Sequence, residues 1–132
     1  KAHSDRPIVV RPHPRDRITL PALPPGVTVD YPKKVTNTYD NFDIHFDYHA
    51  VVNYSSGPGT QAAIAGVRPI VDTTSLAYPV SIQIADIDKE YAVDREQWIT
   101  EICHTEYTLF ELQRGLWFPR IAPALEQSTV PV

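Results

Sequence analysis

The sequence of 132 residues has little cysteine and no long apolar run. Cys103 is its single cysteine, so an internal disulfide is excluded and a reducing compartment is expected. No apolar run is long enough to span a bilayer, and no charged start followed by an apolar stretch marks a secretion signal. We therefore expect a soluble, cytoplasmic protein that is one domain or part of one.

Positive charge is also scarce, and it is concentrated near the start of the sequence. The formal net charge is -4, which argues against a general nucleic-acid-binding surface. Residues 1–34 carry seven Lys or Arg against three Asp, a balance of +4, whereas residues 35–132 carry five against thirteen, a balance of -8. An anion-binding site is therefore expected to draw on the first segment.

Four apolar runs have the length and the β-branched composition of strands: Ile8–Val10, Val27–Val29, Ala50–Tyr54 and Val67–Val71. They are continuous and not alternating, which is typical of strands buried on both faces of a parallel sheet. The segment between the last two runs predicts a crossover helix that ends at Gly66. The expected fold class is α/β, with a Rossmann-like parallel sheet and flanking helices.

The C-terminal third predicts two helices and a tail. Asp94 can cap a first helix, in which Cys103 belongs to the apolar residues and is expected to be a core thiol. Thr108 and Glu111 have the spacing of a capping box that begins a second helix. The helical pattern is then lost, so residues 119–132 are predicted to be a proline-containing tail.

The first candidate site follows the first predicted strand, where Arg11, His13 and Arg15 alternate with two prolines. Ligands bind at the carboxyl ends of the strands in an open parallel sheet. Guanidinium groups and an imidazole N–H at that edge suit a phosphate or a diphosphate. The alternative interpretation is a solvated basic turn.

The second candidate site is the strand-to-helix turn after Ala50–Tyr54, which contains Ser55, Ser56, Gly57, Gly59 and Thr60. Small residues let a ligand approach the backbone, hydroxyl groups donate hydrogen bonds, and the helix directs its positive end toward the loop. This turn also suits an anion. Alternatively, Ser56 caps the helix and the glycines form an ordinary turn.

Two further segments were weighed as sites. The loop Asp72–Pro79 contains Ser75, whose hydroxyl is a candidate contact for a sugar or a ribose, although the pattern favours a plain connecting loop. His45 and His49 have no firm third ligand, so no metal site is predicted. No cofactor is expected either.

The pairs His13–Pro14 and Ser55–Ser56, each after a predicted strand, resemble motifs of the GT-B glycosyltransferases. The similar group comprises capsule polysaccharide enzymes, bacterial sialyltransferases and phage glycosyltransferases of modified DNA bases, and the resemblance covers most of residues 7–118. It implies that residues 1–118 are a nucleotide-sugar-binding half-domain, part of the C-terminal lobe. The catalytic base in this group usually comes from the N-terminal lobe, so no base is assigned here. The implied donor-binding residues are Arg11, His13, Arg15, Ser55, Ser56, Gly57, Gly59, Thr60 and Ser75.

The resemblance implies transfer of a sugar from a nucleotide sugar to an acceptor hydroxyl, in a polysaccharide or in a modified base of phage DNA. An N-terminal lobe or a partner subunit would complete the enzyme, and a phage protein would act in the cytoplasm of its bacterial host. Two other hypotheses stay open. One is a non-catalytic binding or assembly module with the same fold, and the other is a flavodoxin-like phosphate or nucleotide binder unrelated to sugars.

Overall fold

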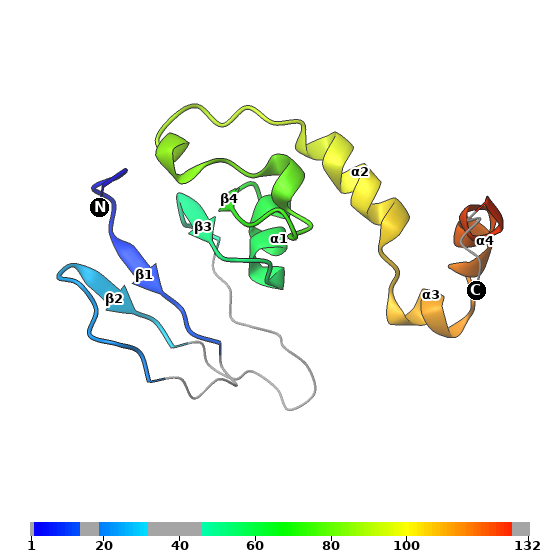
Figure 1. Cartoon of the computed structure of the whole chain (residues 1–132), viewed down its shortest axis with the longest axis horizontal. Coiled ribbons are helices and arrows are strands. Elements are labelled where there is room, and N and C mark those ends of the chain that lie inside the picture. Colours follow the sequence, from blue (N-terminus) through cyan, green and yellow to red (C-terminus); the bar gives the residue numbers. More distant parts are fainter. Residues whose placement is uncertain (1, 14–18, 32–45, 128–132) are drawn as a thin grey trace. The chain divides into compact units, whose positions relative to one another are not determined.

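The computed structural model describes residues 2–13, 19–31 and 46–127. The chain divides into two compact units, Lys1–Val93 and Asp94–Val132. Figure 1 shows strands and the first helix in the first unit, and the yellow to red helices in the second. The predicted functional division at residue 118 is a different boundary and stays a prediction. Among the described residues, no helix is long and apolar enough to cross a membrane.

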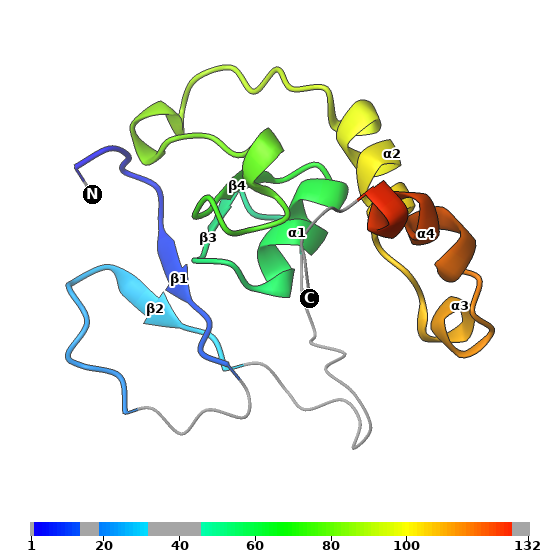
Figure 2. The same cartoon turned by 45° about the vertical axis from the view of Figure 1, so that its right-hand side comes forward.

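The first unit contains two pairs of parallel strands. Strand β1 (Ile8–Val10) pairs with β2 (Val27–Val29), and Ile8 lies opposite Val27. Strand β3 (Ala50–Val52) pairs in the same way with β4 (Arg68–Ile70). In both Figure 1 and Figure 2 the strands follow one another in the order β2, β1, β3, β4. All four predicted runs therefore contain a strand, and the mixed α/β class with parallel pairing is confirmed.

The strands are less buried than their sequence predicts. Within the described part of the chain they form two separate two-stranded sheets and not one sheet. Val9 is 38% exposed and Val52 is 60% exposed, so the prediction of strands buried on both faces was wrong. Such burial requires helices over both faces of a continuous sheet. Here helix α1 (Gly57–Ile64) contacts β3 and β4.

Helix α1 connects β3 to β4 and supplies the centre of a small core. Its Ala62 and Ala63 are completely buried, because a methyl side chain lets the helix approach the two strands closely. The helix ends before Gly66, which has the left-handed φ of 92° predicted for it. Two short 3₁₀ helices, η1 (Tyr78–Val80) and η2 (Ile84–Asp86), follow β4.

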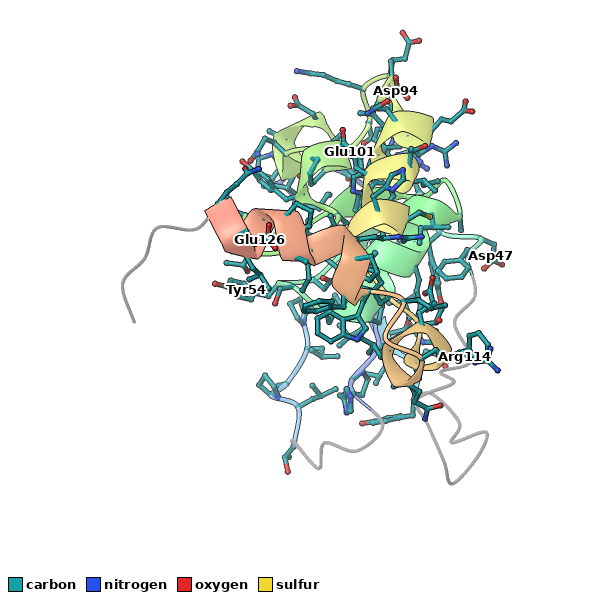
Figure 3. All side chains as sticks on the ribbon, turned by 90° about the vertical axis from the view of Figure 1, so that its right-hand side faces the viewer. Asp47, Tyr54, Asp94, Glu101, Arg114 and Glu126 are labelled. Carbon is teal, nitrogen blue, oxygen red and sulfur yellow. The ribbon has the colours of Figure 1, made fainter. Side chains whose placement is uncertain are left out.

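In the second unit, the described residues 94–127 form α2 (Arg95–Thr105), α3 (Leu109–Gln113) and α4 (Phe118–Gln127). The Asp94 carboxylate accepts the Gln97 N–H at 2.9 Å and caps α2, along which Glu101 also lies (Figure 3). Thr108 and Glu111 form the predicted capping box of α3, with Thr108 N–H donating to Glu111 Oε2 at 2.8 Å. Both predicted helix starts are confirmed.

Two predictions in this unit were wrong. Cys103 is exposed and is not a core thiol, whereas Trp98 of the same helix is only 3% exposed. The two residues lie about 140° apart around a helix of about 3.6 residues per turn, so one cannot share the buried side of the other. Residues 119–127 belong to α4, where a tail was predicted for residues 119–132. Pro119 is compatible with this helix because it lies in the first turn, where no N–H is needed.

Two glycines of α1 provide a matched test of packing. A Cβ atom on Gly59 would lie 2.6 Å from Asn53 Nδ2, whereas a Cβ atom on Gly57 would meet nothing within 4 Å. We expect Gly59→Ala to lower the free energy of unfolding by about 1–2 kcal/mol and Gly57→Ala to leave it unchanged or raised by a few tenths. Urea unfolding of both variants measures this, and equal stabilities would contradict the close contact of Gly59 with Asn53.

Candidate functional site

A cleft of about 1050 Å³ lies between β1 and β3 in the first unit. It is lined by every residue of Ile8–Val10 and of Ala50–Val52. Consecutive residues of a strand point to opposite faces of the sheet, so a cleft lined by three in a row runs along the edge of each strand. The cleft therefore separates two strand edges, and its two ends have different chemistry.

The amino end of the cleft is held by one carboxylate. Asp88 Oδ1 lies 2.7 Å from Arg6 Nε, just before β1, and 3.4 Å from His49 Nε2, just before β3. The hydrogen bond from Arg6 contributes most to lowering the pKa of Asp88, and one from the Ser4 hydroxyl comes next. Strands β1 and β3 thus begin side by side.

His49 has a structural role at this end. Its Nε2 donates to the Ile87 carbonyl oxygen at 2.7 Å, and its Nδ1 then accepts from Arg68 Nη1 at 3.1 Å. Both ring nitrogens are engaged in contacts that join β3 to β4 and to the segment after η2. His45, the other histidine weighed as a metal ligand, lies outside the described residues.

The carboxyl end of the cleft brings together the two predicted anion-binding turns. Arg11 and His13 follow β1, Ser56 and Gly57 follow β3, and all four line the cleft. Arg11 Nε lies 3.0 Å from a carboxylate oxygen of Asp30, which follows β2, and this ion pair orients the guanidinium group. Segments far apart in the sequence therefore present a cation, an imidazole and a hydroxyl at one end of the cleft.

Ser56 is not used as a helix cap. It stands at the N-cap position of α1 with an extended backbone, φ -78° and ψ 153°, but its side chain makes no capping hydrogen bond. In the first turn Pro58 has no N–H, and the Gly59 N–H donates to the Ser56 carbonyl at 3.0 Å. The Ser56 hydroxyl and the Gly57 N–H are therefore the donors that this helix start directs outward.

The other predicted residues of this turn do not line the cleft. Ser55 is exposed, Thr60 is half-buried in α1, and Gly59 is buried against Asn53. Arg15 lies outside the described residues. The sequence thus identified the turn, and the structure shows that, of the predicted residues in this turn, Ser56 and Gly57 line the cleft.

The loop after β4 has local hydrogen bonds of its own. The Ser75 hydroxyl is buried and accepts the Ala77 N–H at 3.3 Å, and Ser75 is not among the cleft-lining residues. Asp72 Oδ1 accepts the Thr74 N–H at 3.1 Å, and this bond contributes most to lowering the Asp72 pKa. These contacts close a turn and favour the interpretation of a plain connecting loop.

Asn53 is a cleft residue that sequence reasoning missed. It follows β3 directly, and its side-chain nitrogen and oxygen are both buried without a hydrogen-bond partner among the described residues. A buried amide without partners costs about 1–3 kcal/mol for each unsatisfied group. Its signal in the sequence is the single polar residue within the apolar run Ala50–Tyr54.

Comparisons of the chain with protein-family models, with curated proteins and with solved structures found no match. The GT-B resemblance is therefore supported by motifs alone. A functional assignment must come from the geometry of the cleft and from the chemistry of its two ends.

The ion pair of Asp88 with Arg6 predicts a pH-dependent stability. Because the folded-state pKa lies below 3.8, the ionised carboxylate stabilises the fold above that pH, and this stability is lost as the pH falls through the lowered pKa. Asp88→Asn should therefore lower the unfolding midpoint at pH 7, and its difference from the parent chain should shrink below pH 3.8. Denaturant unfolding across this pH range measures the difference.

The control is Asp86→Asn, which removes the ion pair with Lys89, a pair that joins residues only three apart in the sequence and does not connect two strands. This change should cost no more than about 0.5 kcal/mol, as is usual for surface pairs. If the two variants lose the same stability at pH 7, the bridging role of Asp88 is contradicted.

Proposed function

We propose that the carboxyl end of the cleft binds the phosphate groups of a nucleotide sugar, and that the chain is the donor-binding part of a GT-B-type glycosyltransferase. The observation that supports this proposal is that Arg11, His13, Ser56 and Gly57 line one cleft. They include one residue of each motif of the resemblance, His13 and Ser56. A coarser function, the binding of a phosphate-containing nucleotide, follows from the same donors without the resemblance.

Each of these residues offers a group suited to phosphate oxygens. Arg11 supplies positive charge, and its ion pair with Asp30 limits the motion of the guanidinium group. The exposed His13 ring donates an N–H, and the Ser56 hydroxyl is not used in capping α1. The Gly57 N–H lies at the positive end of α1, which favours an anion.

These groups would stabilise the leaving nucleotide during transfer. The acceptor hydroxyl oxygen forms a bond to the anomeric carbon while the bond from that carbon to the phosphate oxygen breaks. The phosphate oxygen leaves with the electron pair and gains negative charge, which the surrounding donors stabilise electrostatically. The hydroxyl proton goes to a base supplied by a second lobe. The acceptor class is a polysaccharide hydroxyl or a hydroxymethyl group on a base of phage DNA.

Alanine substitutions of the donor-site residues, with a neighbouring serine as the control, test the donor site. Ser56→Ala and His13→Ala should each weaken nucleotide-sugar binding about tenfold to a hundredfold, because each removes a hydrogen bond to a charged phosphate. Ser55→Ala is the control and should bind almost as the parent chain does, since Ser55 does not line the cleft. Titration calorimetry with a panel of nucleotide sugars measures the affinities. Unchanged affinity in both test variants would remove the proposed site.

A second prediction concerns transfer. The resemblance implies an acidic catalytic base, but Asp and Glu are absent from the cleft-lining residues of the described segments. Proton abstraction needs such a base within about 2.6–3.2 Å of the acceptor hydroxyl. Residues 1–132 alone should therefore show no sugar transfer, and a second lobe should restore it. The assay offers the donor panel with hydroxymethylated DNA and with oligosaccharides. Multiple turnovers by the chain alone would contradict the assignment of the base to another lobe.

A further inference from the structure

The edges of β1 and β3 that face the cleft have backbone groups without a neighbouring strand. Within the described residues, β1 pairs only with β2, and β3 pairs only with β4. Along a strand, the N–H and C=O groups of successive residues face opposite edges of the strand in turn. This alternation identifies which groups face the cleft.

In β1, the Val10 carbonyl accepts the Asp30 N–H at 3.0 Å. The backbone N–H and C=O groups of Val10 therefore face β2, and those of Val9 face the cleft. In β3, the Asn53 N–H donates to the Ile70 carbonyl at 3.2 Å. The backbone of Asn53 therefore faces β4, and the backbone N–H and C=O groups of Val52 face the cleft. Each edge therefore presents the donor and acceptor pattern that a parallel strand pairs with.

The two edges also run in the same direction. Asp88 joins the residues just before β1 and β3 at one end of the cleft, and Arg11 and Ser56, which follow the two strands, line the other end. One added strand can therefore pair in parallel with both edges at once. Such a strand would convert two pairs into one parallel sheet of ordinary width.

The dimensions and the lining of the cleft fit this occupant. A strand residue occupies about 3.3 Å along the chain, about 4.8 Å between strands and about 10 Å through the layer, so about 1050 Å³ holds roughly six extended residues. Between Arg6 and Arg11, the cleft is lined by a proline followed by apolar β1 residues. Ile84 and Ile87 also line it. The occupant must then be apolar on both faces and uncharged in its centre.

The Asn53 side chain indicates a polar partner at the carboxyl end of this strand. Its buried nitrogen and oxygen need an acceptor and a donor, and a backbone peptide group offers both. A phosphate offers acceptors alone, so it satisfies the nitrogen and not the oxygen. The pair of unsatisfied atoms is therefore better matched by a polypeptide backbone.

We propose that the cleft between β1 and β3 is a docking site for an added β-strand: an apolar segment of about six residues from another polypeptide chain, parallel to both edges. The donor site at the carboxyl end is not required for this docking. The two proposals can therefore fail independently.

The first experiment uses a labelled, capped peptide with six central Val and Ile residues and lysines at both ends. We expect saturable binding by fluorescence anisotropy. The same peptide with alternate central nitrogens methylated keeps its apolar side chains but loses donors, and it should bind about tenfold more weakly or worse. Equal binding of the two peptides, or no binding of the parent peptide, would overturn the proposal.

Hydrogen exchange locates the bound peptide on the unmodified chain. The amides of Val9 and Val52 should exchange more slowly when the peptide is bound, whereas the Asn53 amide, already bonded to Ile70, should change little. Slowed exchange of Val9 and Val52 in a self-associated chain without peptide would identify a second copy as the occupant and overturn the assignment to another polypeptide.

A pair of variants tests the edge directly. Val52→Pro removes the N–H that faces the cleft, and a proline is tolerated at an open strand edge. Val52→Ala keeps the N–H and removes part of the same side chain. Peptide affinity should fall further in Val52→Pro than in Val52→Ala at similar unfolding midpoints, and equal affinities would contradict backbone pairing at this edge.

Discussion

The carboxylate of Asp88 connects the segments that precede β1 and β3, and the cleft lies between these two strands. It lies within 3.4 Å of both Arg6 and His49, which precede β1 and β3. Among the described residues these strands share no ladder, so side chains must hold their amino ends together. This arrangement lies at one end of the cleft, and the two turns that follow β1 and β3 line the other end.

A small core makes the exposed strand edges energetically important. The completely buried hydrophobic residues include Ala62, Ala63 and Ala77, and their methyl groups contribute little apolar area. Larger side chains such as Val52, which is 60% exposed, lie at the open edges. A partner that covers these edges and binds only the folded chain would stabilise the fold by mass action, by an amount that grows with the logarithm of its concentration once that exceeds the dissociation constant. Stability and recognition are therefore linked in this unit.

Local features of the fold could be predicted from the sequence, and long-range features could not. The caps at Asp94 and Thr108 and the end of α1 before Gly66 depend on side chains and backbone angles within a few residues. The division into two sheets depends on which strands meet, and an apolar run does not encode its neighbours. Helix α4 was missed because Pro123 and the residues after it were interpreted as a tail, although the helix contains Pro123 in its interior.

The candidate site shows the same limit. Both turns were identified from composition. Ser55 and Ser56 have the same side chain, but only Ser56 lines the cleft, and this difference depends on the path of the backbone, which the sequence does not specify. The importance of Asn53 could not be predicted either, because an unsatisfied amide is defined by what surrounds it.

The two proposed sites share a boundary, and this has a mechanistic consequence. A strand paired with β1 and β3 would end beside Asn53, next to Ser56 and to the turn that contains Arg11. It would exclude water from the inner side of the anion site, and charge-assisted hydrogen bonds are stronger where water is excluded. Binding free energies are coupled reciprocally, so a bound nucleotide would favour the docked strand to the same extent that the strand favours the nucleotide. Docking of a second polypeptide would then also complete the donor site.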